Sequence, residues 1–446
     1  GRYKSAAFRS LRQGQPVVVL GARSAAFAPF AKLGLIIVDE EHDPSYKQDR
    51  DPRYHVRDIA LFRAKYHEAV LLLGSATPSL ETYYRAQAGR LKLLTIRERP
   101  TKVPLPEVQI VDMRSAQGKN EIFSEALIEE MTQRLAKKEQ VILFLNRRGY
   151  ARVLICRECG FLFKCPHCDV SLTYHLADET LTCHYCGYER QATARCEACG
   201  SQRISRLGFG TERVETELRT IFPRARIARL DRDATRQRGA HSRIIHTFEQ
   251  GEADILIGTQ MVAKGLDFPS VTLVGVISAD ALLAFPDFRA RERTFQLLTQ
   301  VAGRAGRRDV PGKVIVQTCL PGDPAIVACA GHDYDQFYQQ EIKMRQRLGY
   351  PPFSHLIRLL TSSRSQERAF QAAQALAVHL ETIISGQGLN ANVLGPAPAL
   401  LTKLKNRYRY QVTIKGYHHR GLRQAAREAM EKLKEETGQR SVEVSV

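Results

Sequence analysis

The sequence predicts an α/β protein, and three observations support this fold class. Short aliphatic runs that end in acidic, glycine or small hydroxyl residues alternate with segments of helical periodicity, which is typical of open α/β sheets. Eight cysteines gather between residues 156 and 199 and interrupt this alternation. Beyond residue 321, a helix expected at 365–386 precedes strand-like segments, which indicates an α+β carboxyl-terminal domain.

Length and charge limit the possible classes of protein. A chain of 446 residues is long enough for about two to four domains. Its formal net charge of +19 favours a polyanionic partner, either nucleic acid or an anionic membrane. No apolar run approaches the roughly 20 residues that a bilayer helix needs, and no signal peptide precedes the first strand. We therefore expect no membrane partner and a cytoplasmic location.

The first predicted elements are strands. Residues 17–21 are expected to form a short buried strand. A glycine followed by four aliphatic residues, at 34–38, predicts a second strand buried on both faces. Asp39 and Glu40 fall at its carboxyl end, where open α/β sheets bind ligands, and they match the magnesium-holding carboxylate and adjacent base of nucleotide hydrolases. The alternative for these acids is a helix cap or a solvated turn.

The segment at 43–58 shows neither helical nor strand periodicity and mixes aromatic residues with cations. Such a mixture suits stacking on unpaired bases with contacts to phosphate, and the alternative is an ordinary polar loop. The candidate DNA-binding residues are Tyr46, Lys47, Arg53, Tyr54 and His55. A strand at 70–73 then leads into the segment at 74–78, whose hydroxyl residues either relay hydrogen bonds or cap a helix.

Prolines among charges at 97–120 indicate a linker. Ser124 is expected to cap an amphipathic helix, and a buried strand at 141–145 follows. The alternating pattern resumes near Gly208, with strands at 254–258 and 271–277 and a helix that ends in the segment 300–307. Two arginines in that segment could be an ordinary surface charge pair. The high density of glycines around them favours a functional role instead.

The eight clustered cysteines form four Cys-x-x-Cys pairs, which in a cytosolic chain indicates metal rather than disulfides. Eight thiolates make two tetrahedral zinc sites with no position left for water. Nesting of the pairs favours an inner site and an outer site. The inner ligands are Cys165, Cys168, Cys183 and Cys186, and the outer ligands are Cys156, Cys159, Cys196 and Cys199. His167 and His184 lie within the pairs and are expected not to bind metal.

Five segments occur in the order of superfamily 2 helicase motifs II to VI: 39–42, 74–78, 144–149, 258–267 and 300–307. Together with four Cys-x-x-Cys pairs between motifs IV and V, they resemble the primosomal protein N′ family, the replication-restart DNA helicases of bacteria. The resemblance covers essentially the whole chain. It implies two RecA-like lobes, the first incomplete, with a two-zinc insertion in the second.

Roles carried over from this family fall on matching residues. The resemblance implies that Asp39 holds magnesium with ATP, that Glu40 activates the attacking water, and that Arg304 and Arg307 act as arginine fingers. It places three further residues near the nucleotide: Gly265, Asp267 and Gln300. The implied domains are lobe 1 at 1–110, lobe 2 at 111–151 and 203–320, the zinc insertion at 152–202, and a DNA- and partner-binding domain at 321–446.

No Gly-x-x-x-x-Gly-Lys-Ser/Thr phosphate loop occurs in the sequence. We expect that loop upstream of Gly1, so that this chain is the carboxyl-terminal part of the protein and not an autonomous ATPase. Alternating cations at 403–410 could present one face to phosphate, or form a solvated edge strand.

The function that the resemblance implies is ATP-dependent 3′→5′ unwinding at stalled or abandoned replication forks, followed by primosome assembly. The implied partners are forked and single-stranded DNA, single-stranded-DNA-binding protein, other primosome proteins and the loader of the replicative helicase, in a nucleoid-associated location. Two alternatives stay open at this point: a zinc-dependent nucleic-acid-binding scaffold without motor activity, and an RNA helicase.

Overall fold

The computed structural model describes residues 11, 17–48, 52–96, 104–114, 121–145, 153–176, 178–208, 210–231, 234–235, 239–259, 268–306, 312–437 and 443–445. The chain divides into two compact units, Gly1–Leu94 and Thr95–Val446. Within the described parts, no helix is both long and apolar enough to cross a bilayer.

The first unit is built on a two-stranded parallel sheet, in which β1 (Leu35–Val38) pairs with β4 (Val70–Leu73). Helix α2 (Val56–His67) packs on one face of this sheet, where Val38, Val56 and Ala60 form a small core. The remaining elements are η1 (Arg23–Phe27), η2 (Pro44–Tyr46), a hairpin of β2 (Lys47–Gln48) and β3 (Tyr54–His55), and α3 (Leu80–Gln87).

Two strand predictions for this unit are wrong. Residues 17–20 form no strand, because they pair with no strand among the described residues. Without such a partner, Val18 and Leu20 are exposed. Strand β1 is present but not buried on both faces: Leu35 is 50% exposed and Ile37 is 63% exposed. Side chains alternate across a strand, so α2 covers only every second residue of β1.

The second unit contains a six-stranded sheet in the order β12-β13-β6-β14-β15-β5, and every described pairing in it is parallel. Its strands are β12 (Ile227–Leu230), β13 (Ile255–Gly258), β6 (Gln140–Phe144), β14 (Val271–Val276), β15 (Lys313–Thr318) and β5 (Glu107–Asp112). The segment expected as a linker thus contains β5. The last proline of the segment lies just before this strand. Within the strand, Val108 and Ile110 alternate with polar residues and pair with β15.

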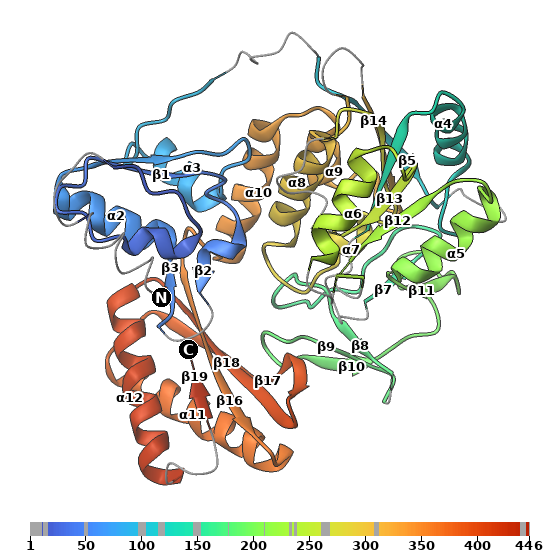
Figure 1. Ribbon diagram of the computed structural model, residues 1–446. Coiled ribbons are helices and arrows are strands. Elements are labelled where there is room, and N and C mark those ends of the chain that lie inside the picture. Colours follow the sequence, from blue (N-terminus) through green and yellow to red (C-terminus); the bar gives the residue numbers. More distant parts are fainter. Residues whose placement is uncertain are drawn as a thin grey trace. The chain divides into compact units, whose positions relative to one another are not determined.

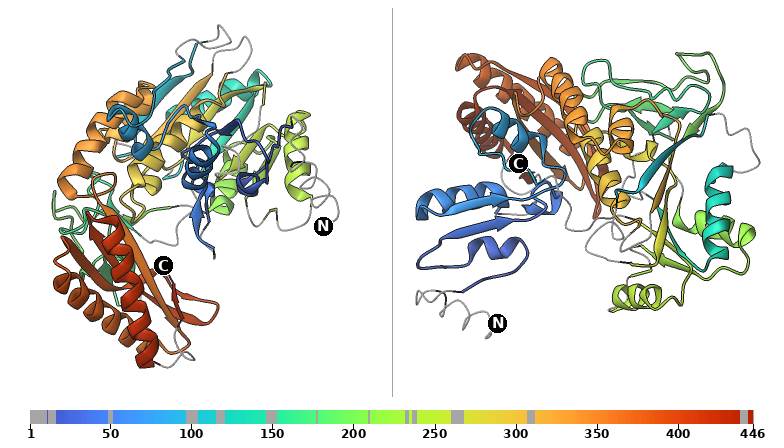
Figure 2. Two further views of the ribbon diagram at one scale, coloured as in Figure 1. Left: turned by 90° about the vertical axis from the view of Figure 1, so that its left-hand side faces the viewer. Right: turned by 90° about the horizontal axis from the view of Figure 1, so that it is seen from above.

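Helices cover both faces of this sheet. Helices α4 (Glu125–Ala136) and α5 (Thr211–Ile221) bury Leu127, Met131 and Leu218 on one face. Helix α8 (Ala290–Ala302) lies across the sheet from them (Figures 1 and 2). The other helices of this region are α6 (Ala240–Glu249), α7 (Asp280–Leu283), α9 (Pro324–Ala330) and α10 (Tyr334–Leu348).

The cysteine-rich region lies in sequence between β6 and α5 and forms small sheets of its own. Strands β7 (Leu154–Cys156) and β11 (Ile204–Arg206) pair at its two ends. Between them, β8 (Thr173–His175), β9 (Thr180–Thr182) and β10 (Glu189–Gln191) form an antiparallel meander. The chain therefore leaves and re-enters the large domain at neighbouring points.

The carboxyl-terminal region is a four-stranded antiparallel sheet, β17-β18-β16-β19, with two long helices (Figure 1). Helices α11 (Gln366–Gly386) and α12 (His419–Thr437) bury Leu376, Leu380 and Leu422 against it. The strands are β16 (His355–Ser363), β17 (Ala391–Leu404), β18 (Arg407–Gly416) and β19 (Glu443–Ser445). Strand β18 is interior, so the edge-strand alternative for 403–410 does not hold for its β18 residues.

Candidate functional site

The acidic residues after β1 divide by exposure. Asp39 and Glu40 are exposed, whereas Glu41 is 1% exposed. The Glu40 N–H donates to Asp39 Oδ1 at 2.9 Å, and Glu40 has a φ of 46°. Left-handed backbone is uncommon outside glycine and is concentrated at functional sites. The turn therefore holds two adjacent carboxylates in solvent at the carboxyl end of a parallel strand, which is where open α/β sheets bind ligands. Carboxylate oxygens are among the hard ligands that Mg²⁺ prefers.

The buried third acid, Glu41, is a structural centre of the first unit. Its carboxylate accepts hydrogen bonds from Ser79 N at 2.6 Å, Thr82 Oγ1 at 3.1 Å and Arg57 Nη1 at 2.8 Å. Arg57 lies on α2, and Ser79 is the N-cap of α3. Glu41 thus joins the turn after β1 to both helices, and sequence reasoning did not identify this role.

The turns after β1 and β4 contact each other through His42. His42 Nδ1 and Ser75 Oγ lie 2.7 Å apart, and the same nitrogen is 3.6 Å from Glu40 Oε2. The Glu41 N–H also donates to the Gly74 carbonyl at 3.0 Å. Ser75 is one of the hydroxyl residues considered for a hydrogen-bond relay, and its contact with His42 connects the segment at 74–78 to the side chain of Glu40.

Most candidate DNA-binding residues have contacts within the unit. The Tyr46 hydroxyl donates to the Asp39 carbonyl at 2.7 Å, and burial together with the charges of Asp39, Asp43 and Glu40 raises the pKa of Tyr46. Tyr54 packs edge-on against Phe27 with ring centroids 4.9 Å apart.

His55 accepts from Arg57 N at 3.2 Å as the N-cap of α2, and burial lowers its pKa to about 4. Lys47 is exposed and Arg53 is half-buried. These five residues lie on or next to a hairpin rather than in an irregular loop. The sequence did not reveal this hairpin because β2 and β3 are too short to show strand periodicity.

The arginine segment after α8 lies in the second unit. Gln300 is in the last turn of α8, and Arg304 follows its C-cap, Gly303, in a half-buried turn. The Gly306 N–H donates to the Val271 carbonyl at 3.1 Å, so this turn reaches the amino end of β14. Arg307, Gly265 and Asp267 lie outside the described residues, as does the segment at 146–149.

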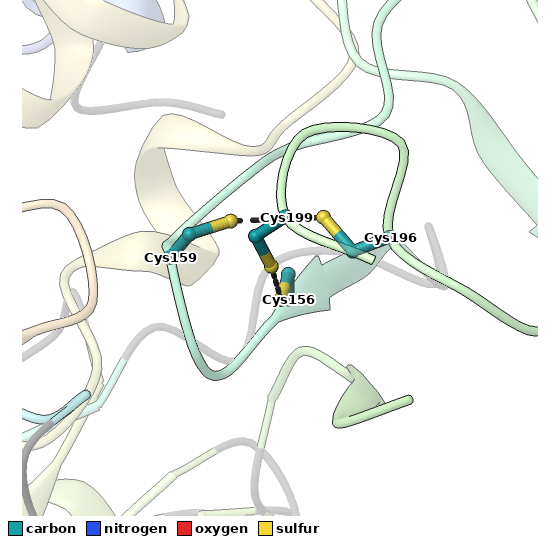
Figure 3. A group of neighbouring side chains, drawn as sticks. All are labelled: Cys156, Cys159, Cys196 and Cys199. Atoms are coloured by element: carbon teal, nitrogen blue, oxygen red, sulfur yellow. Dashed lines mark hydrogen bonds between the residues drawn. The ribbon is translucent and has the colours of Figure 1, made fainter. Parts of the chain in front are cut away.

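The eight cysteines meet in two groups of four, with the pairing expected from nesting. In each group, the four Sγ atoms lie within 4.8 Å of one another. We call Cys156, Cys159, Cys196 and Cys199 the outer zinc site (Figure 3) and Cys165, Cys168, Cys183 and Cys186 the inner zinc site.

Sulfur spacing tests the fit of zinc. Zn–S bonds of about 2.3 Å in a tetrahedron place sulfurs about 3.8 Å apart. The Sγ–Sγ distances are 3.7 Å for Cys156–Cys199, 3.6 Å for Cys159–Cys196 and 3.6 Å for Cys165–Cys186. The two groups of four thiolates therefore fit two zinc ions, and each ion would hold two cysteine turns together. His167 and His184 are in neither group.

One turn geometry recurs four times around these sites. The residue after the second cysteine of each pair has positive φ: Gly160 at 78°, Asp169 at 52°, Gly187 at 80° and Gly200 at 73°. Each donates its N–H to the carbonyl of the first cysteine at 2.8–3.0 Å. Asp169, which breaks the glycine pattern in the sequence, adopts the same turn, since aspartate tolerates left-handed backbone better than most residues.

The outer zinc site contacts the end of the six-stranded sheet. A Cβ at Gly160 would clash with the Cys319 carbonyl, and Arg157 Nη1 lies 3.6 Å from Cys319 Sγ. The buried carboxylate of Asp280 accepts from Cys319 N and from Thr318 Oγ1, and burial raises the pKa of Asp280. These contacts hold the first outer turn at the carboxyl end of β15.

The inner zinc site contacts the carboxyl-terminal region. His184 Nδ1 lies 2.7 Å from the Pro398 carbonyl, and Gln411 Nε2 donates to the His184 carbonyl. The Tyr350 hydroxyl donates to the Cys168 carbonyl at 2.8 Å. A Cβ at Gly187 would press on the Pro396 carbonyl. The inner site is thus in contact with Tyr350, which precedes the carboxyl-terminal sheet, and with strands β17 and β18 of that sheet.

Three family models match separate parts of the chain. The PriA DNA helicase Cys-rich region domain matches residues 165–191, the helicase conserved C-terminal domain matches residues 202–309, and the primosomal protein N C-terminal domain matches residues 346–446.

Curated relatives match nearly the whole chain. The replication restart protein PriA of Bacillus subtilis is 46% identical over 441 residues, which is 98% of this chain and 54% of the relative. The protein of the same name from Synechocystis is 44% identical over 419 residues, 92% of this chain and 50% of the relative. Over these residues, the chain belongs to the PriA family. It spans about half the length of these curated relatives.

The match to PriA accounts for the observed architecture. The PriA cysteine-rich region covers the inner zinc site, and the PriA carboxyl-terminal domain covers the sheet of β16 to β18 that encloses it. The solved structure of S. cerevisiae Dbp5 L327V bound to RNA and ADP BeF3 overlaps with a TM-score of 0.34 at 14% identity, covering 71% of this chain and 63% of that chain.

Proposed function

We propose that these residues are the carboxyl-terminal half of an ATP-dependent 3′→5′ DNA helicase that recognises stalled or abandoned replication forks and starts primosome assembly. The observation that carries this proposal is the coincidence of 46% identity to a replication restart protein with an exposed Asp39–Glu40 pair at the end of a parallel strand. Two zinc ions fill the inner and outer sites and keep the cysteine-rich region folded.

The catalytic roles in this proposal follow the family resemblance, supported for Asp39 and Glu40 by the geometry of the turn after β1. Asp39 would provide a carboxylate oxygen for the magnesium that accompanies ATP, and that ion would supply positive charge for the phosphates. Glu40 accepts a proton from the attacking water, and its contact with His42 orients its carboxylate. Arg304 and Arg307 neutralise charge on the transferring phosphate, with Gln300, Gly265 and Asp267 beside the nucleotide.

The proposed nucleic-acid contacts follow from charge and from position on or beside the β2–β3 hairpin. Lys47 and Arg53 on the β2–β3 hairpin contact phosphates of single-stranded DNA, while Tyr46, Tyr54 and His55 hold the hairpin against the unit. Proposed partners of the whole protein are forked DNA, single-stranded-DNA-binding protein, other primosome proteins and the loader of the replicative helicase. We also propose that it works at the nucleoid.

The test uses the longer protein that contains these residues, with Glu40→Gln as the variant. Expected results are retained binding of ATP and DNA, with loss of ATP hydrolysis and of unwinding of substrates with a 3′ single-stranded tail. Arg304→Ala should also spare DNA binding and slow hydrolysis, since arginine fingers are typically worth about 10³–10⁵ in rate. Full activity of the Glu40→Gln protein, or equal unwinding of RNA duplexes, would overturn the proposal. A protein that binds DNA without ATP hydrolysis in its unsubstituted form would instead be a scaffold.

The isolated 446-residue chain is expected to bind DNA but hardly to hydrolyse ATP. It contains no Gly-x-x-x-x-Gly-Lys-Ser/Thr loop, whose amides, lysine and hydroxyl hold the phosphates and magnesium. Without that positioning, ATP is not aligned with Glu40. Steady-state ATPase assays with and without single-stranded DNA check this expectation, and DNA-stimulated turnover equal to that of the longer protein would contradict it.

A further inference from the structure

The two zinc sites differ in how well they are covered. In the second turn of the outer zinc site, residues 193–200 are exposed with the exception of Cys196, and Cys199 itself is exposed. The contacts of this turn are polar and peripheral: Arg190 pairs with Glu197, and Thr193 Oγ1 donates to the Arg195 carbonyl at 2.8 Å. Solvent and small solutes therefore reach one ligand of the outer site directly.

The inner zinc site is covered by packing. Cys165, Cys168 and Cys183 are buried, and they belong to a cluster with Phe163, Leu181, Phe288 and Tyr350. The Tyr350 hydroxyl binds the Cys168 carbonyl, and the Tyr350 ring stacks on Phe288 with centroids 4.7 Å apart. The fourth inner ligand, Cys186, is half-exposed, so neither this residue nor its three buried neighbours matches the exposure of Cys199.

We propose that Cys199 is an oxidation site for peroxides, and that its reaction closes a Cys199–Cys156 disulfide and releases zinc from the outer site alone. Thiolates are the reactive form of cysteine, and susceptibility follows exposure. Cys156 is fully buried, but its Sγ lies 3.7 Å from that of Cys199, so it is placed to resolve an oxidised Cys199. This inference rests on the zinc occupancy in the proposed function.

The reaction is a two-electron oxidation. The Cys199 sulfur attacks one oxygen of hydrogen peroxide, the O–O bond breaks, and hydroxide leaves to give a sulfenic acid at Cys199. The Cys156 thiolate then attacks the Cys199 sulfur, the S–S bond forms, and a second hydroxide leaves. Two protons from solvent convert both hydroxides to water. The ion has lost two of its four ligands, so it dissociates from Cys159 and Cys196.

Zinc release from the intact 446-residue chain tests the proposal. Elemental analysis first establishes two zinc ions per chain; fewer would contradict the zinc occupancy rather than the oxidation step. Hydrogen peroxide is then added with a chromophoric zinc chelator. The expected result is release of one of the two equivalents, with a Cys156–Cys199 disulfide in peptide mass spectra and inner-site cysteines still reduced. A thiol reductant with added zinc should restore the second equivalent.

Matched variants separate the two sites. Cys199→Ala should contain one zinc ion and show no peroxide-induced release. Tyr350→Phe removes only the hydroxyl that binds the Cys168 carbonyl, so it should weaken the inner site by about tenfold and leave the peroxide-sensitive release unchanged. Release of both equivalents together, absence of any release, or a first disulfide within the inner site would overturn the proposal.

Discussion

At the scale of single residues, three consecutive acids after β1 have different environments. Asp39 and Glu40 face solvent, while Glu41 accepts hydrogen bonds from α2 and from the N-cap region of α3. A run of acids at the end of a strand does not itself reveal which member is buried. The alternation of the β1 side chains would not reveal it either, because Glu40 adopts left-handed backbone and breaks the alternation.

Glu41→Gln is expected to destabilise the first unit by about 3 kcal/mol, because Arg57 then faces a neutral group inside the fold. Hydrogen exchange of amides in α2 and α3, measured in the whole chain, reports this loss of local stability. Glu40→Gln is the matched control and should leave the exchange rates unchanged. Equal effects of the two substitutions would show that Glu41 has no special structural role.

His55 makes the stability of the first unit depend on pH. The pKa of His55 is about 4 in the folded state, against an ordinary value of 6.5, because burial and the nearby Arg57 disfavour the charged form. Asp58 and Glu41 oppose this shift, and Lys47 adds to it. Between these two pH values the unfolded state binds more protons, so the free energy of unfolding falls as pH decreases from 6.5 to 4.

In His55→Asn, asparagine can still cap α2 but does not titrate. Amide exchange in α2 as a function of pH should therefore lose most of its acid sensitivity in this variant. An unchanged pH profile would rule out His55 as the group responsible.

At the scale of elements, sequence periodicity identified most of the second unit. The apolar runs at 141–145, 254–258 and 271–277 correspond to β6, β13 and β14, and Ser124 caps α4 by accepting from Leu127 N. Each of these strands is buried on both faces. Such a strand shows as a continuous apolar run, which can be recognised in the sequence without knowing the strands beside it.

Short or partly exposed elements were harder to predict. The β2–β3 hairpin has two residues in each strand, and residues 17–20 have strand composition without a described pairing partner. The grouping of the eight cysteines into two sets of four was predictable, because Cys-x-x-Cys spacing and ligand chemistry are local signals. Contacts such as Gly160 with Cys319, or His184 with Pro398, depend on residues more than 150 positions apart and have no local signal.

Gly160→Ala is expected to destabilise the outer zinc site and its attachment to β15. The new methyl group meets the Cys319 carbonyl, in addition to the roughly 1–2 kcal/mol cost of left-handed backbone. Gly200→Ala is the control, since Gly200 has a similar φ of 73° but no atom within 4 Å of an added Cβ. Competition with a zinc chelator should show a larger loss of outer-site affinity for Gly160→Ala, and equal losses would refute the packing argument.

At the scale of the whole molecule, the excess of cations lies outside the cysteine-rich region. Residues 156–199 contain four cations and six acids, whereas the complete chain has a net charge of +19. We therefore expect phosphate attraction to lie elsewhere, for example at the β17–β18 hairpin, where Lys403 and Lys405 are exposed. Arg407 is less available because it binds the backbone and side chain of Ser362.

Replacing both hairpin lysines, as Lys403→Gln with Lys405→Gln, should reduce the dependence of single-stranded DNA binding on salt. Each lost phosphate contact lowers the slope of log affinity against log salt by about 0.7. Arg195→Gln, which removes an exposed cation of the cysteine-rich region, should leave the slope unchanged. Fluorescence anisotropy titrations at several salt concentrations measure both, and a reversed pattern would assign phosphate contacts to the cysteine-rich region.

The pairing of β7 with β11 also bears on how the chain folds. Strand β6 must find its neighbours in the large sheet although 66 positions separate Phe144 from Gly210, the N-cap of α5. Once Leu154 lies beside Arg206 and the outer site has bound zinc, the effective connection shortens to about a fifth of that length. Loop-closure entropy grows with the logarithm of length, so prior assembly of the insertion lowers the cost of joining the sheet by roughly 1.5 kcal/mol. Metal capture early in synthesis would therefore accelerate folding of the surrounding domain.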